Sequence, residues 1–378
     1  MISPENFVRH LALRGINFFS GVPDSALSGI CNYLDRRLDR DCHAPAVNEG
    51  SAVSIAMGYH FGSGKIPVVY LQNSGLGNAV NPLASLASPE IYAVPMLLVI
   101  GWRGMPGKKD EPQHVLQGRV TTQQLDLLDI PYAVIHAEET QWRERVDGLI
   151  NMAVEGSRPV ALICHPKTFE DLPFERTLQN KNCSLTRELA LATIYKTLVG
   201  RYAMVATTGK CGRELHEIIE KEGGDQDSLL VVGGMGHAIS ICLGLCLGSN
   251  SQDVALLDGD GAFLMHMGTI ATVGAYRPTG LIHVLLNNGC HESVGGQPTN
   301  INTVDIEQLI KSVGYESYQF ADSTDTLEKS LEAVVRSVKP AFLEIKINAL
   351  SRNDLGRPTH SPGRNKEQFM QRIRATRP

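Results

Sequence analysis

The chain has 378 residues, of which 43% are hydrophobic and 20% charged, a globular composition that excludes a disordered chain. Its formal net charge of −5 argues against a protein that binds nucleic acid. The longest apolar stretches, 95–101 and 238–248, are shorter than the roughly 18 residues of a membrane-spanning helix, so we expect no membrane segment.

The N-terminal residues and the cysteines indicate the cellular compartment in which the protein is expected. The N-terminus has no basic segment followed by an apolar core, which is the pattern of a secretory signal. The eight cysteines include no Cys-x-x-Cys pair, and reduced thiols in packing positions are expected in so long a chain. We therefore expect a cytoplasmic protein.

The first half of the chain alternates helix-like and strand-like segments. Ser3 and Pro4 form a typical helix start, and Gly15 is expected to end that helix. Strands are predicted at 16–19, 44–47, 66–71, 95–100, 132–135 and 159–164. They are apolar throughout rather than alternating, which is typical of a parallel sheet covered on both faces.

The alternation stops between residues 166 and 186, where Pro166, Pro173 and mixed charges indicate an interdomain linker. It then resumes, with strands predicted at 202–206, 229–232, 254–257, 281–286, 318–320 and 341–347. The sequence therefore predicts an α/β fold of two doubly wound parallel-sheet domains, 1–165 and 187–350, which use the same architecture twice.

The last segment, 351–378, differs in charge from the rest. It carries seven basic residues against two acidic ones, whereas the chain as a whole is acidic. Two interpretations stay open, a solvated basic helix or arm, and an arm that packs near an anionic ligand or a partner subunit.

The most informative stretch is a Gly-Asp-Gly turn, 259–261, followed after one helix and one strand by Asn287 and Asn288. Twenty-five residues separate the two motifs, enough for one parallel crossover, so Asp260 and Asn288 are expected at the same carboxyl edge of the sheet. Carboxylate and amide oxygens are ligands that suit Mg²⁺. Gly259 and Gly261 let the backbone approach a phosphate.

These motifs together resemble the signature of the thiamine diphosphate enzyme superfamily. The resemblance implies thiamine diphosphate and Mg²⁺ as cofactors, with Asp260, Asn288 and the carbonyl oxygen of Cys290 as metal ligands. It also implies that Met235, in a Gly-Gly-Met-Gly turn, supports the bent cofactor. The implied cofactor-binding residues are Gly234, Met235, Gly236, Gly259, Asp260, Gly261, Ala262 and Asn288.

The first half supplies a candidate activating carboxylate, Glu49, at the start of a helix. Taken alone, it is an ordinary helix N-terminal acid that the helix dipole favours. With the metal motif present, the resemblance implies that Glu49 hydrogen-bonds the pyrimidine ring of the cofactor and relays a proton through it. It also implies active sites shared between subunits, and hence a homodimer or a higher homo-oligomer.

Several segments closely resemble the phosphonopyruvate and sulfopyruvate decarboxylase group. They are GVPDS at 21–25, NEGSA at 48–52, QNSGLGN at 72–78, DEPQH at 110–114 and NNGCHESVGGQPT at 287–299. The match spans nearly the whole chain. The chain also resembles this group in having no middle domain between its two halves. It implies decarboxylation of phosphonopyruvate, a small anionic 2-keto acid of phosphonate biosynthesis, to phosphonoacetaldehyde and CO₂.

The chain departs from these relatives in two places. Gly212 stands where most of them have serine, and Val294 stands where the larger pyruvate-type decarboxylases have a glutamate. Glu292 is close to that second position but off register, so the acid's role is not transferred to it. Sulfopyruvate decarboxylase, or a related 2-keto acid decarboxylase or acyloin synthase, remains an alternative.

The implied substrate carries a carboxylate and a phosphonate, so cations and a proton donor are expected near it. Ser25 is expected to touch its carboxylate, and His114 is a candidate proton donor or a structural loop residue. Asp24 is a further candidate contact. Candidate anion contacts are Arg103, Lys108, Lys109, Arg119, Lys210 and Arg213, of which Lys210 and Arg213 are better placed because they follow a strand-end Thr-Thr-Gly; His237 and His291 are weaker candidates.

Two other classes of protein are alternatives to a decarboxylase. A non-catalytic cofactor-binding subunit is disfavoured because Glu49 and the metal motif are both intact. A nicotinamide-dependent oxidoreductase is disfavoured because no Gly-x-Gly-x-x-Gly follows a strand with an acidic residue about 20 positions later.

Overall fold

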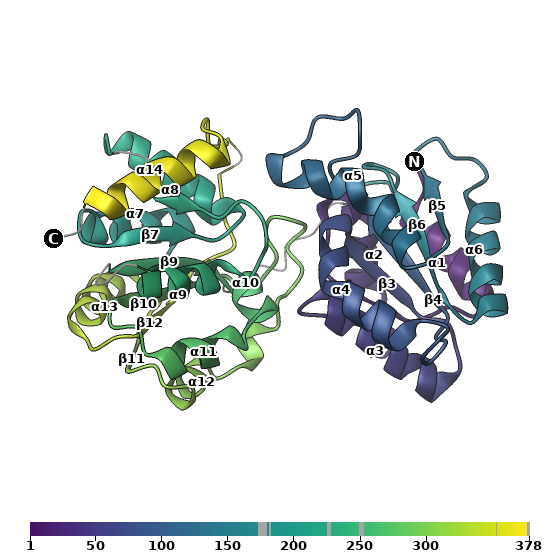
Figure 1. Cartoon of the computed structure of the whole chain (residues 1–378), viewed down its shortest axis with the longest axis horizontal. Coiled ribbons are helices and arrows are strands. Elements are labelled where there is room, and N and C mark those ends of the chain that lie inside the picture. Colours follow the sequence, from purple (N-terminus) through teal and green to yellow (C-terminus); the bar gives the residue numbers. More distant parts are fainter. Residues whose placement is uncertain (173–179, 181–182, 225–227, 249–252, 353, 376–378) are drawn as a thin grey trace. The chain divides into compact units, whose positions relative to one another are not determined.

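The computed structural model describes residues 1–172, 180, 183–224, 228–248, 253–352 and 354–375. The chain divides into two compact units. Unit 1 comprises Met1–Glu175 with Val294–Gln297, and unit 2 comprises Arg176–Ser293 with Pro298–Pro378. Much of the predicted linker, residues 173–179 and 181–182, lies outside the described residues. Figure 1 shows a sheet in each unit with helices on both of its faces.

Unit 1 is built on a parallel six-stranded sheet in the order β2-β1-β3-β4-β6-β5. Its strands are β1 (Phe19–Gly21), β2 (His43–Pro45), β3 (Val68–Gln72), β4 (Met96–Gly101), β5 (Tyr132–Ile135) and β6 (Pro159–Cys164). Its helices are α1 (Pro4–Leu13), η1 (Ser25–Leu27), α2 (Ser28–Arg37), α3 (Glu49–Ser63), η2 (Asn73–Gly75), α4 (Leu76–Pro82), η3 (Leu83–Ala87), α5 (Pro112–Leu127) and α6 (Trp142–Gly156).

Unit 2 is built on a second parallel six-stranded sheet, in the order β11-β12-β10-β9-β7-β8. Its strands are β7 (Ala203–Ala206), β8 (Leu229–Leu230), β9 (Val254–Gly259), β10 (Leu281–Asn287), β11 (Ser317–Ala321) and β12 (Ala341–Lys346). Its helices are α7 (Arg187–Leu198), α8 (Lys210–Lys221), α9 (Ala238–Gly248), α10 (Asp260–Met265), α11 (Thr269–Tyr276), η4 (Ile301–Thr303), α12 (Ile306–Ser312), α13 (Thr324–Arg336) and α14 (Pro362–Ala375).

The two sheets have the same topology. When the strands of each unit are numbered from its own first strand, both orders read 2-1-3-4-6-5. This confirms the prediction of two doubly wound α/β domains that use one architecture twice. In both units the direction of winding reverses between the first and third strands, β1 and β3 or β7 and β9. Open parallel sheets bind ligands at the carboxyl ends of strands beside such a reversal.

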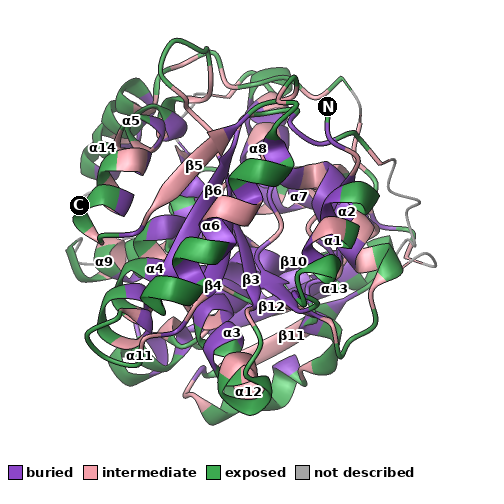
Figure 2. Ribbon diagram, turned by 90° about the vertical axis from the view of Figure 1, so that its right-hand side faces the viewer, coloured by how far each residue is buried: buried purple, intermediate pink, exposed green. Residues whose placement is uncertain are grey.

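The strands are apolar throughout because each sheet face is covered by helices. In β4, Leu97 and Val99 join one hydrophobic cluster of unit 1, while Leu98 and Ile100 join the cluster on the opposite face. Unit 2 repeats this with two clusters on either side of β10. Figure 2 shows the consequence, with the central strands buried and the outer surfaces of the helices exposed.

The first strand is displaced from its predicted position at 16–19. β1 comprises Phe19–Gly21 and pairs with β2 and β3 from Phe19 onward, whereas Ile16 is buried in the core before the strand begins. The apolar pattern marked a buried segment correctly but did not reveal which of its residues make the ladder hydrogen bonds.

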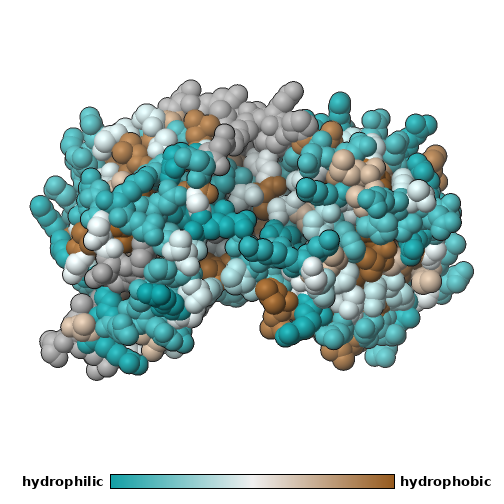
Figure 3. All heavy atoms as spheres, turned by 90° about the horizontal axis from the view of Figure 1, so that it is seen from above, coloured by the Kyte–Doolittle hydropathy of each residue, from teal (hydrophilic) through white to brown (hydrophobic). Residues whose placement is uncertain are grey.

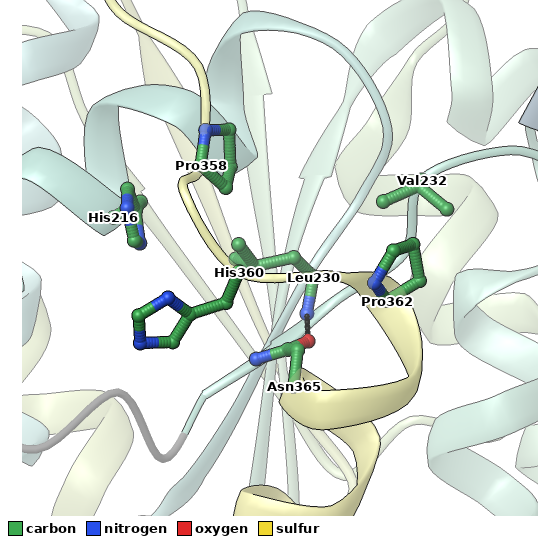
Figure 4. Close-up of a pocket in the computed structure, with 7 residues that line it drawn as sticks. All are labelled: His216, Leu230, Val232, Pro358, His360, Pro362 and Asn365. Carbon is green, nitrogen blue, oxygen red and sulfur yellow. Dashed lines mark hydrogen bonds between the residues drawn. The ribbon is translucent and has the colours of Figure 1, made fainter. Parts of the chain in front are cut away.

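The basic C-terminal segment packs on unit 2. Asn365 of α14 accepts a hydrogen bond from the Leu230 N–H (2.9 Å) and donates one to the Ser228 carbonyl (2.7 Å). Its side-chain amide thereby binds backbone groups at the edge strand β8 and at the residue directly before it. Figure 4 shows Asn365 and Leu230 with other residues lining a small pocket between α8, β8 and this segment, among them His216 and His360.

Surface character agrees with the composition. On the face drawn in Figure 3, hydrophilic side chains predominate and hydrophobic ones form small groups. Among the residues that the structure describes, no helix combines the length and apolarity needed to cross a bilayer.

Candidate active site

A pocket with an empty volume of about 540 Å³ lies at the winding reversal of unit 2. Segments that follow β7, β9 and β10 line it, so it is at the carboxyl edge where parallel sheets bind ligands. Its lining residues include Arg187, Thr207, Thr208, Gly209, Lys210, Cys211, Met235, Gly259, Asp260, Gly261, Ala262, Asn288, Cys290, His291 and Glu292.

Asp260 is a buried carboxylate in this pocket. It begins α10 directly after β9, and its Oδ1 accepts from the Gly261 N–H (2.8 Å). Its Oδ2 accepts from the Gly289 N–H (2.6 Å) and from the Thr299 hydroxyl (3.1 Å). Burial raises the pKa of Asp260 to about 7 despite these hydrogen bonds. The raised pKa indicates that the surrounding protein groups do not by themselves compensate the negative charge of ionised Asp260. A buried carboxylate of this kind is suited to bind a cation.

Asn288 and Cys290 complete the predicted oxygen set. Asn288 follows β10 and is buried, and its Oδ1 accepts from the Cys290 N–H (3.1 Å). Both residues line the same pocket as Asp260. Two side-chain oxygens and a backbone carbonyl in one pocket are the hard donors that Mg²⁺ takes, with further positions left for water and phosphate. The described residues thus fit a magnesium site.

Met235 and His291 flank Gly261. A Cβ at Gly261 would lie 3.0 Å from Met235 Cε and 2.9 Å from His291 Cε1, so the glycine leaves room that a side chain would fill. Gly234 and Gly236, on either side of Met235, both have positive φ, which favours glycine in this turn.

The N-terminus of α8 lines the pocket and is a candidate anion-binding element that the sequence prediction did not identify. α8 begins at Lys210 after Gly209, whose φ of +98° is disfavoured for other residues. The first N–H groups of a helix have no partners within it and attract anions such as phosphate. The Thr-Thr-Gly that follows β7 marks this turn in the sequence, but there it indicated only the candidate cations Lys210 and Arg213.

Four charged side chains form a network beside the pocket. Arg187 binds Glu214 through two hydrogen bonds (2.9 and 3.0 Å) and donates to Glu292 (2.8 Å). Lys210 Nζ donates to Glu292 (2.9 Å) and to Ser351 (2.6 Å). Burial by itself would raise the pKa of Glu292, but Arg187, Ser351 and Lys210 hold that pKa below its usual value. Lys210 is therefore already paired with a carboxylate.

In unit 1, Glu49 is buried at the first position of α3. Its Oε2 accepts from Asn78 Nδ2 (2.8 Å), and its Oε1 faces Gly75, where a Cβ would lie only 2.2 Å away. Burial raises the pKa of Glu49, and the hydrogen bond from Asn78 opposes this shift. A carboxyl group with a raised pKa holds its proton closer to neutral pH, as a proton-exchanging group requires.

The loop after β3 links three candidate residues of unit 1. Gln72 donates to Asp24 Oδ1 (2.5 Å), Asn73 donates to the Arg103 carbonyl (2.9 Å), and Gly75 contacts Glu49. Asp24 is fully buried against Gly101, and burial raises its pKa. Within the described residues, Asp24 Oδ2 has no hydrogen-bond partner.

Asp110 organises the other candidates of unit 1. It accepts from Arg103 Nε (2.9 Å) and Nη2 (2.5 Å), from His114 Nδ1 (3.0 Å), and from two backbone N–H groups. Arg103 Nη1 in turn donates to Ser25 Oγ (2.8 Å). Burial would raise the pKa of Asp110, but the hydrogen bonds from Arg103 and His114 hold it well below its usual range. The structure thus brings Ser25, Arg103 and His114 together.

Some predicted residues lie apart from these clusters. Arg213, on α8, is not among the residues that line the 540 Å³ pocket, and His237 stacks on His266 with 4.2 Å between ring centroids. Lys108, Lys109 and Arg119 are exposed. The sequence interpretation did not choose Asp110, which binds Arg103 and His114, or Arg187, which binds Glu214 and Glu292.

Family comparisons agree with this geometry. Residues 4–127 match the family described as "Thiamine pyrophosphate enzyme, N-terminal TPP binding domain", and residues 200–345 match its "C-terminal TPP binding domain". Thiamine pyrophosphate is another name for thiamine diphosphate. The chain belongs to the thiamine pyrophosphate enzymes.

Three curated relatives show which enzymes of this family are similar to the chain. The chain is 32% identical to the phosphonopyruvate decarboxylase of Streptomyces viridochromogenes, over 98% of this chain and 94% of that protein. It is also 32% identical to the phosphonopyruvate decarboxylase of Streptomyces hygroscopicus, over 96% and 92%. A sulfopyruvate decarboxylase of Methanosarcina acetivorans is 28% identical over 71% of this chain and 72% of its own length.

Proposed function

We propose that this chain decarboxylates phosphonopyruvate to phosphonoacetaldehyde and CO₂ with thiamine diphosphate and Mg²⁺. The observation that carries the proposal is the 32% identity to two phosphonopyruvate decarboxylases over almost the whole chain, which includes both halves of a thiamine pyrophosphate enzyme. The retention of Glu49 and Asp260 in buried, polar surroundings supports a catalytic rather than a structural role for the fold.

We assign the cofactor end of the site as follows. Asp260, Asn288 and the Cys290 carbonyl hold Mg²⁺, and the N-terminus of α8 receives the diphosphate. Glu49 would be the group that exchanges a proton with the pyrimidine ring of the cofactor when it is bound. The bound cofactor supplies the electron sink that lets the substrate carboxylate leave as CO₂.

The substrate end is assigned to the cluster around Asp110. Arg103 and Ser25 offer donors to an anionic group of the substrate, and Asp24 directly precedes Ser25 in the chain. His114 directs Nδ1 toward Asp110. Its other nitrogen, Nε2, would then be the one that gives a proton to the substrate carbon from which CO₂ has left. A second candidate substrate, sulfopyruvate, is favoured by the similarity to the Methanosarcina acetivorans enzyme.

An assay with both acids tests the proposed function. Purified protein with thiamine diphosphate and Mg²⁺ is expected to release CO₂ and an aldehyde from phosphonopyruvate, with a higher kcat/KM than from sulfopyruvate. Omitting either cofactor should remove the activity. A higher kcat/KM for sulfopyruvate would move the assignment to the second candidate, and no CO₂ from either acid would contradict decarboxylation.

We also propose that the enzyme is a homodimer or higher homo-oligomer in which Glu49 and the metal site of one active site come from different chains. Sulfopyruvate decarboxylase of Methanothermobacter thermautotrophicus has separate alpha and beta subunits, which match 39% and 38% of this chain. That relative supports a site assembled from two polypeptides.

Complementation between inactive variants tests the shared site. Co-expressed Glu49→Gln and Asp260→Ala chains are expected to recover about a quarter of wild-type activity, because half of randomly paired dimers are hybrids with one intact site of two. Each variant expressed alone is the control. If mixed chains are no more active than the single variants, both residues act within one chain.

A further inference from the structure

The side chain of Asn288 can serve a cation in only one of its two amide orientations. An amide has an acceptor oxygen and a donor nitrogen of nearly equal size, so packing alone does not distinguish them. In the structure, Asn288 Nδ2 donates to Glu292 Oε2 (3.3 Å) and Asn288 Oδ1 points the other way, toward the Cys290 N–H. A carboxylate only accepts and a backbone N–H only donates, so Glu292 on one side and the Cys290 N–H on the other both select this orientation.

Glu292 is itself held in position by two cations. Arg187 Nη1 donates to Oε2, the same oxygen that faces Asn288, and Lys210 donates to Oε1. Arg187 is fixed by its paired hydrogen bonds to Glu214, and both of these side chains are buried. The Glu292 carboxylate is therefore contacted by residues at the starts of α7 and α8, and by Asn288 in its own loop after β10.

We propose that Glu292, anchored by Arg187, is a positioning residue that sets the amide orientation of Asn288, so that Oδ1 is presented to the cation. This inference rests on the proposed metal site. Residues that orient metal ligands typically change metal affinity by about 10- to 100-fold when they are replaced. The inference gives Glu292 a role although it is off register with the catalytic glutamate of the larger decarboxylases.

The charges in the network argue against a direct anion-binding role for these cations. Arg187 directs Nε and Nη2 to Glu214 and Nη1 to Glu292, and Lys210 also pairs with Glu292. Two cations and two carboxylates balance, so the network as a whole has little net attraction for a diphosphate. Its effect on the cofactor is therefore expected through the geometry of Asn288.

A double-mutant cycle separates orientation from charge. The probe is Mn²⁺ in the presence of thiamine diphosphate, and the readout is the Mn²⁺ dissociation constant from the electron paramagnetic resonance signal of the free ion. Glu292→Leu is compared in two backgrounds, the wild type and Asn288→Asp. Aspartate has an oxygen at either end, so it needs no partner to choose its orientation. Glu307→Leu, which removes an exposed ion pair with Lys311, is the matched control.

Glu292→Leu is expected to weaken Mn²⁺ binding about 10- to 100-fold in the wild-type background and less than about threefold in the Asn288→Asp background. Glu307→Leu should leave it unchanged. An equal loss in both backgrounds would overturn the inference, because Glu292 would then act through charge or folding. If the wild type binds no Mn²⁺ with thiamine diphosphate, the proposed metal site itself fails. Should Glu292→Leu unfold, as judged by circular dichroism, Glu292→Met, which also lacks an oxygen that could accept from Asn288 Nδ2, replaces it in the same cycle with the same dependence on the background.

Discussion

Glu49→Gln is expected to reduce turnover by a factor on the order of 10²–10⁴ while most of the thiamine diphosphate affinity remains. Glutamine keeps the size of the side chain and an oxygen that can accept from Asn78, but it cannot exchange a proton. Because the side-chain size and the hydrogen bond with Asn78 are kept, the expected loss is chemical rather than structural. Steady-state decarboxylation and calorimetric titration with thiamine diphosphate measure the two quantities.

Three further variants make this result specific. Glu144→Gln changes an exposed acid in the first turn of α6 and should leave activity unchanged. Gly75→Ala should lower activity, because its Cβ would lie 2.2 Å from Glu49 Oε1. Gly77→Ala should be neutral, because a Cβ there has nothing within 4 Å. Normal turnover by Glu49→Gln would eliminate the proposed proton relay.

Strand content and the metal motif could be predicted because both depend on local sequence. A strand covered on two faces must be apolar at every position, so β4, β6 and β10 are recognisable as continuous runs. A crossover has a minimum length, so the spacing between Asp260 and Asn288 predicted a common sheet edge, and both residues line one pocket. The repetition of one architecture in both halves followed from the similar count of such runs, whereas the strand order within each sheet did not.

The networks that hold the candidate residues could not be predicted because their members are far apart in the chain. Arg187 meets Glu214 and Glu292 across 27 and 105 positions, and no local pattern marks it. Lys210 was expected to face the substrate, but its pairing with Glu292 depends on how β10 and α8 are juxtaposed. Asp110 is only four residues from His114, yet its role as a common acceptor depends on the conformation of one loop.

Asp260→Ala is expected to abolish the Mg²⁺-dependent binding of thiamine diphosphate. The substitution removes the one carboxylate of the proposed metal site, and without it Asn288 and a backbone carbonyl offer only neutral oxygens. Wild-type protein should melt at a higher temperature when Mg²⁺ and thiamine diphosphate are added together, because ligands that bind only the folded state stabilise it. The variant should lose that shift, and calorimetry should show no metal-dependent binding.

The control for this change is Asp325→Ala, which removes an exposed acid at the start of α13 and should keep the full thermal shift. Folding of Asp260→Ala without ligands is checked by circular dichroism. Its buried carboxylate has a pKa raised to about 7 by desolvation, so burying the ionised form costs folding free energy and offsets part of what its hydrogen bonds contribute. A folded variant is therefore expected. If that variant binds thiamine diphosphate as tightly as the wild type at every Mg²⁺ concentration, Asp260 is not the metal ligand and the phosphate end of the site must be reassigned.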